Sequence, residues 1–143
     1  MDFAPNYKLK RPGSSGSSLE GQTSMLVSEL MNAATSFHKL HLKVTGLGSY
    51  AQHKALNELY DALPDHADTL AEGFQGAAEK ILNYEDSAPR ILNSVEEGLS
   101  YMRELCQQVN SLQAVMPYSE IVNDLDMIKS TMNSIKYKLL FLK

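Results

Sequence analysis

Residue types that bind metal ions are concentrated in the second quarter of this 143-residue chain. All four histidines lie there, and they are His38, His41, His53 and His66. Asp68 and Glu72 follow, four residues apart. Imidazole together with carboxylate suits iron, and also zinc or manganese. The sequence therefore suggests a metal site with four candidate ligands: His41, His53, Asp68 and Glu72.

The spacing of these candidates prevents one helix from bringing them all to one ion. His53 and Asp68 would lie about 22 Å apart along a helix, whereas ligands lie within about 2.2 Å of a metal. His41 and His53 flank a glycine-containing stretch, so they can meet at one end of a helical hairpin. Two copies packed antiparallel about a twofold axis would then complete the site twice. A Glu-x-x-His arrangement within one bundle is excluded, because no histidine has an acidic residue three positions before it.

An acidic strip would accompany the candidate site on the second helix. On an ideal helix its members lie between about 60° and 120° from His53, and they are Asp61, Asp65, Asp68 and Glu72. Like charges four residues apart cost a few tenths of a kcal/mol each. The strip is either a solvated face or a surface that a cation or partner neutralises. His66 is either a surface residue or a group supporting that strip, and His38 is interpreted as a helix-face residue.

Apolar residues at three- and four-residue spacing predict four helices to position these groups. We expect them over residues 23–44, 49–82, 87–112 and from 119 to the C-terminus. Ser87 is expected to cap the third helix with Pro89 in its first turn. Pro64 is expected to kink the second helix without ending it. No alternating strand pattern occurs, so an all-α antiparallel four-helix bundle with short connections is predicted.

Composition limits the class of protein further. Apolar residues make up 43% and charged residues 21%, which is typical of a single globular domain. The net charge of −4 argues against a broad phosphate-binding face. A membrane partner is not expected, and the sequence contains no Gly-rich phosphate loop or Gly-x-Ser-x-Gly motif. The single Cys106 is interpreted as a packed thiol, consistent with a cytoplasmic location.

Residues 1–18 differ in composition from the predicted bundle of residues 19–143. They contain the run PGSSGSS and three basic residues, Lys8, Lys10 and Arg11. Three interpretations stay open: a plain linker, an arm that lies on a neighbouring subunit during assembly, and a weak DNA contact.

The motif HLKVTG, residues 41–46, resembles the end of the first helix in the mini-ferritins, the DNA-protecting proteins from starved cells (Dps). That family has His-Trp-Asn-Val-x-Gly there, with further ligands 12, 27 and 31 positions after the histidine. In this chain these spacings fall on His53, Asp68 and Glu72. The C-terminal stretch EIVNDLDMIKSTMNSIKYKLLFLK is also similar to small ferritin-like proteins of tailed bacteriophages.

The resemblance implies a ferritin-like bundle that binds and oxidises ferrous iron. His41 and His53 of one subunit would bind iron together with Asp68 and Glu72 of a second subunit, and a shell of twelve subunits would store the product. Leu42 stands where the family has Trp, so we expect no nearby aromatic side chain to absorb oxidising equivalents. The competing interpretation is a phage structural protein of the virion, which contacts other phage proteins and uses the bundle only for assembly.

Overall fold

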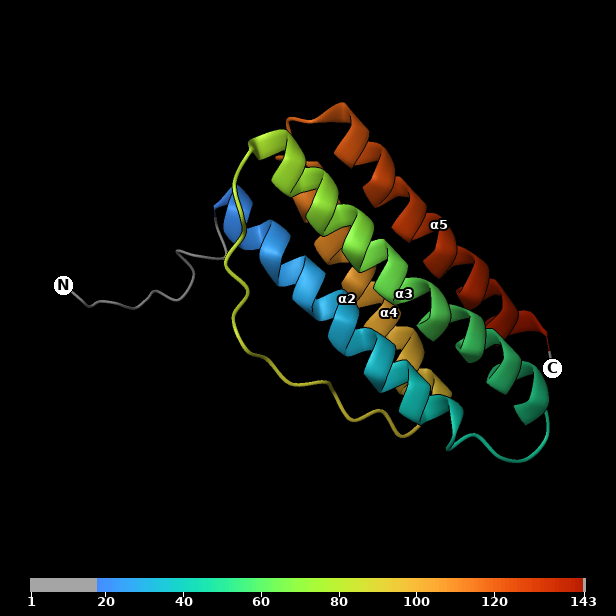
Figure 1. Cartoon of the computed structure of the whole chain (residues 1–143). Coiled ribbons are helices and arrows are strands. Elements are labelled where there is room, and N and C mark those ends of the chain that lie inside the picture. The colour runs from blue at the N-terminus through green and yellow to red at the C-terminus, as the bar shows by residue number, and fades with distance from the viewer. Residues whose placement is uncertain (1–17, 143) are drawn as a thin grey trace.

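Four helices account for most of residues 18–142, the part of the chain that the computed structural model describes. They are α2 (Leu19–His41), α3 (Ser49–Ala78), α4 (Val95–Gln113) and α5 (Ser119–Phe141). The described residues contain no strand. The predicted all-α four-helix bundle is therefore confirmed (Figure 1).

The connections give the bundle its topology. Helices α2 and α3 form an antiparallel hairpin, and α4 and α5 form another (Figure 1). Residues 79–94 connect the two hairpins and run along the length of the bundle. Helices α3 and α4 therefore point in the same direction (Figure 1). We call this segment the crossover. One long crossover is the topology of ferritin-like bundles, and the expectation of short connections was wrong here.

The predicted start of the third helix at Ser87 was also wrong. The N-cap is Ser94, seven residues after the predicted cap, and helix α4 begins at Val95. The Ser94 hydroxyl accepts a hydrogen bond from the Glu97 amide (3.1 Å), and the Glu97 carboxylate accepts one from the amide of Asn93 (2.9 Å). This reciprocal pattern resembles a capping box and ends the crossover at a defined residue.

The other helix ends lie close to their predicted positions. Ser18 caps α2 by accepting from the Gly21 amide, so this helix begins four residues earlier than expected. Helix α3 ends at Ala78 because Glu79 adopts a left-handed conformation with φ of 55°. Pro64 lies inside α3, which continues on both sides of it as predicted.

The core lies between the four helices and consists mainly of leucine. The largest side chains at its centre include Phe37, Phe74, Tyr101 and Met102. The crossover adds Leu82 and Leu92, which are both buried. Ile81 and Ile91, which a continuous helix would bury, are 78% and 79% exposed. The two ends of the crossover are thus attached to the core by one leucine each.

Polar side chains of α2 and of the turn after it bind the second half of the crossover. Two donors lie on α2 and one lies in the turn that follows it, and the bonds are Asn32 Nδ2 to Ser87 Oγ (2.7 Å), Ser36 Oγ to the Arg90 carbonyl (2.8 Å) and Lys43 Nζ to the Leu92 carbonyl (2.8 Å). The Ser36 hydroxyl and the Lys43 ammonium therefore satisfy two backbone carbonyls of the crossover, which has no helix of its own to pair them.

Arg90 of the crossover also contacts α4. Its guanidinium lies 4.2 Å from the ring centroid of Tyr101 and donates to the Glu104 carboxylate at 2.7 Å. The Tyr101 hydroxyl donates to the Glu29 carboxylate of α2. Burial raises the pKa of Tyr101, and the hydrogen bond to Glu29 raises it further, so the hydroxyl stays a donor. This set of contacts joins α2, α4 and the crossover.

Candidate metal centre

Two of the predicted ligands meet at one end of the α2–α3 hairpin. His41 is the last residue of α2, and His53 lies near the start of α3. Between them Gly46 and Gly48 take positive φ values of 86° and 80°, which glycine adopts without strain. The two imidazole rings stack with centroids 3.7 Å apart and planes inclined by 23°.

A hydrogen bond to the backbone of His41 fixes the orientation and the tautomer of the His53 ring. Its Nδ1 lies 3.0 Å from the His41 carbonyl oxygen, and a carbonyl only accepts, so Nδ1 carries the proton. In the neutral ring Nε2 then holds the free lone pair. Metal-binding histidines typically donate their other ring N–H to a carbonyl or carboxylate in this way. His53 is therefore oriented as a ligand would be.

His41 has a buried ring that lacks a complete set of partners. The residue is 7% exposed, and its Nδ1 atom makes no hydrogen bond within residues 18–142. Burial lowers the pKa of His41, and the neighbouring His53 lowers it further. The neutral form, which is the form that binds metals, is thus favoured near pH 7. An orphaned ring nitrogen beside an oriented histidine fits a metal-binding role.

Two more aromatic rings lie beside the His41–His53 pair: His38 of α2 and Tyr60 of α3. Their rings are 3.9 Å apart and inclined by 8°, and Tyr60 meets His41 edge-on at 5.0 Å. The expectation of no aromatic side chain near the histidines was therefore wrong. Leu42 itself is 71% exposed. Tyr60 could have been found from its spacing, because it lies seven residues after His53 and so on nearly the same face of α3.

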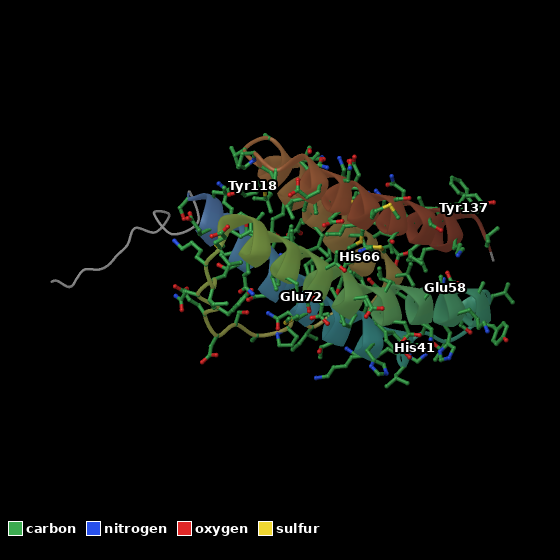
Figure 2. The ribbon with its side chains drawn as sticks, turned by 45° about the horizontal axis from the view of Figure 1, so that its top comes forward. His41, Glu58, His66, Glu72, Tyr118 and Tyr137 are labelled. Atoms are coloured by element: carbon green, nitrogen blue, oxygen red, sulfur yellow. The ribbon has the colours of Figure 1, made fainter. Side chains whose placement is uncertain are left out.

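The two carboxylates lie far from the histidines in the same chain. Asp68 and Glu72 are exposed on α3, about 22 Å and 28 Å along the helix from His53. Figure 2 shows Glu72 well separated from His41. Neither carboxylate makes a hydrogen bond or ion pair with another described residue. Within residues 18–142 of one chain, no group of three or more His, Cys, Asp or Glu side chains could hold a metal. One chain thus presents the candidate ligands as two separate halves.

Charge differs between the two halves. The last turn of α2 carries His38, Lys39 and His41, all basic residue types. The acidic strip of α3 is exposed, and none of its four members takes part in an ion pair among the described residues. The positive charge of Lys39 at the hairpin end and the negative charges of the acidic strip would attract each other between two copies of the chain.

His66 is bound by α5. Its Nε2 lies 2.9 Å from the Thr131 hydroxyl, and burial lowers its pKa. Figure 2 places it between α3 and α5. The ring therefore contributes to helix packing, which is a simpler role than either sequence interpretation.

The chain is an all-α four-helix bundle with one long crossover, and two of its four candidate ligands, His41 and His53, meet at one end. The sequence belongs to DUF5856, a family of unknown function, whose profile matches residues 41–139. The matched range includes all four candidate ligands. No helix among the described residues is long and apolar enough to cross a membrane.

The chain is also similar to a bacteriophage protein. It is 30% identical over 88 residues to the uncharacterized 14.6 kDa protein in the mobD-ri intergenic region of Enterobacteria phage T4. The match spans 62% of this chain and 65% of that protein, slightly less than two thirds of its length. No solved structure matches the chain significantly. Together these findings support a protein of bacteriophage origin.

Proposed function

We propose that this protein binds and oxidises ferrous iron at sites shared between two copies of the chain. The observation that carries the proposal is the arrangement of His41 and His53 at the hairpin end. One ring is oriented by a hydrogen bond to the other residue's carbonyl, and the other has a buried nitrogen without a partner. Two imidazoles held together in this way suit one half of a site for iron, zinc or manganese.

The second copy supplies the other half. Asp68 and Glu72 are one helical turn apart on α3, exposed and unpaired among the described residues. If α2–α3 hairpins pack antiparallel about a twofold axis, each histidine pair lies against the partner's carboxylates, and one interface builds two sites. Two carboxylates would neutralise a divalent ion bound by two neutral imidazoles.

The reaction treats iron as the substrate. Carboxylate ligands favour the ferric over the ferrous state because they compensate the extra positive charge. With peroxide as oxidant, two ferrous ions give up one electron each, and one peroxide with two protons becomes two water molecules. The product would be stored within an oligomeric shell, as the mini-ferritin resemblance implies.

An anaerobic titration with ferrous iron, followed by peroxide, tests this proposal. Ferric absorbance is recorded for the unaltered chain and for Asp68→Asn, with Asp65→Asn as the matched control, because both aspartates are exposed on α3. Rapid oxidation should be lost in Asp68→Asn and kept in Asp65→Asn. Equal rates in the two variants would reject the carboxylate half of the site.

A second function is favoured by the apolar end of the molecule. The α2–α3 turn and the C-terminal end of α5 lie at the same end of the bundle (Figure 1). Exposed apolar side chains there include Leu47, Tyr50, Tyr137 and Phe141. Together with the similarity to a phage protein, this patch suits an assembly block that contacts other phage structural proteins in a virion.

Light scattering separates the two functions. A closed shell of twelve chains of 15.9 kDa amounts to about 190 kDa and requires the dimer contacts that build the sites. We expect a species of that size for the iron-oxidising protein. A monomer at every concentration would favour the assembly block, because one chain cannot join the two halves of the site.

A further inference from the structure

A cavity of about 360 Å³ lies between the first turns of α2 and the start of the crossover, away from the histidine pair. Four carboxylates line it: Glu20 and Glu29 from α2, and Glu85 and Asp86 from the crossover. Met25 lies at its edge with 53% of its surface exposed. The cavity is therefore acidic with one apolar border.

The charges in this cavity are only partly balanced. Glu20 forms an ion pair with Lys80 at 3.4 Å, and the Glu29 carboxylate accepts a hydrogen bond from the Tyr101 hydroxyl. Glu85 and Asp86 make no ion pair or hydrogen bond with any described residue. Two adjacent carboxylates at a concave surface favour a ligand with more than one positive charge.

The sequence before α2 supplies such a ligand. Residues 7–11, YKLKR, which we call the basic segment, carry three positive charges together with Tyr7 and Leu9. The chain enters α2 at the N-cap Ser18, two residues before Glu20. The basic segment is thus covalently attached beside the acidic cavity.

The linker length permits the segment to reach the cavity. Six residues, 12–17, join the basic segment to Ser18 and can span at most about 20 Å. The stretch of α2 from Glu20 to Glu29 is about 14 Å long. Gly13 and Gly16 allow the chain to reverse its direction at low conformational cost. Attachment also gives the segment a high effective concentration at the cavity.

We infer that the acidic cavity between α2 and the crossover binds the basic segment of the same chain. Lys8, Lys10 and Arg11 pair with the carboxylates of Glu85 and Asp86, while an apolar side chain of the segment lies on Met25. Binding is electrostatic and weakens with salt, because exposed charges are screened beyond a few Å at high ionic strength. The basic residues are then occupied within the chain and are not available to nucleic acid.

Limited digestion of the full-length protein with trypsin tests the inference. Trypsin cleaves after Lys8 and Lys10, whereas Arg11 is followed by Pro12 and resists cleavage. The cleavage rate at Lys8 and Lys10 is measured by mass spectrometry for the native protein and for a synthetic peptide of residues 1–17. A segment that is bound nine tenths of the time should be cut about tenfold more slowly than the free peptide.

Two double variants with the same change of charge provide the comparison. Glu85→Gln with Asp86→Asn should raise the cleavage rate to nearly that of the peptide. Asp65→Asn with Glu96→Gln removes two exposed carboxylates outside the cavity and should leave the native rate unchanged. Salt at about 0.5 M should abolish the protection in the native protein when rates are normalised to the peptide.

Two outcomes would overturn the inference. One is a native protein that is cleaved as fast as the peptide or as the cavity variant. The other is protection that disappears on dilution, which would place the segment on a neighbouring copy instead of its own chain. Protection that is independent of protein concentration and lost only in the cavity variant supports binding within one chain.

Discussion

Removing the hydroxyl of Tyr101 should destabilise the bundle, because Tyr101 joins α2, α4 and the crossover. Tyr101 is 1% exposed, and its hydroxyl donates to the Glu29 carboxylate. A hydrogen bond to a charged group contributes about 1.5–3 kcal/mol. Glu29 also lines the acidic cavity, where water can replace the lost donor, so the cost of Tyr101→Phe should lie near the lower limit. Phenylalanine retains the ring that Arg90 covers.

We therefore expect Tyr101→Phe to lower the free energy of unfolding by about 1.5 kcal/mol and the melting temperature by about 5 °C. Urea titration and thermal unfolding measure the two quantities. Tyr84→Phe is the matched control. The Tyr84 hydroxyl also donates a hydrogen bond, to the Gln75 side chain, but Tyr84 itself is 42% exposed. This control should change stability by less than about 0.5 kcal/mol. Equal effects of the two substitutions would refute the assigned role of the Tyr101 hydroxyl.

Gly98→Ala should destabilise the protein by about 1 kcal/mol, because overpacking outweighs the gain in helix propensity. The added Cβ would lie 2.9 Å from Cδ2 of the buried Leu40. Gly76→Ala, where a Cβ would meet nothing within 4 Å, should instead be neutral or stabilising in the same urea titration. Arg90 lowers the pKa of Glu104 by a hydrogen bond, so this carboxylate stabilises the fold above about pH 4.5 and loses that effect as the pH falls. Glu104→Gln should accordingly be less stable than the native protein at pH 7, and the difference should shrink as the pH is lowered below 4.5; a difference that stays constant down to the lowest pH at which the protein folds would contradict this.

Hydrophobic periodicity was sufficient to predict four helices but not the crossover. The apolar residues Ile81 and Ile91 continue the helical spacing of their neighbours, yet both are exposed in a segment without helix. Periodicity alone cannot distinguish a helix from an extended segment that reaches the core through one leucine at each end. Capping chemistry was the better signal, since Ser94 has Glu97 three residues later and Ser87 has Arg90.

The candidate site could be predicted only in its two halves. The spacing around the glycines was enough to expect that His41 and His53 could approach each other, and their rings are in contact. The seven-residue spacing from His53 to Tyr60 could have placed that ring beside the histidines, whereas the contact of His66 with Thr131 depends on packing between helices, which one helix's sequence does not specify. The approach of Asp68 and Glu72 to the histidines depends on a second chain and stays a prediction.

Complementation between two inactive variants tests the shared site most directly. His41→Ala and Asp68→Ala should each lose rapid iron oxidation, since each lacks one half of every site. Unfolding them together and refolding the mixture should give hybrid dimers with one intact site each, so oxidation should recover to about a quarter of the native value. No recovery in a mixture that refolds to native helix content would contradict a site built from two chains.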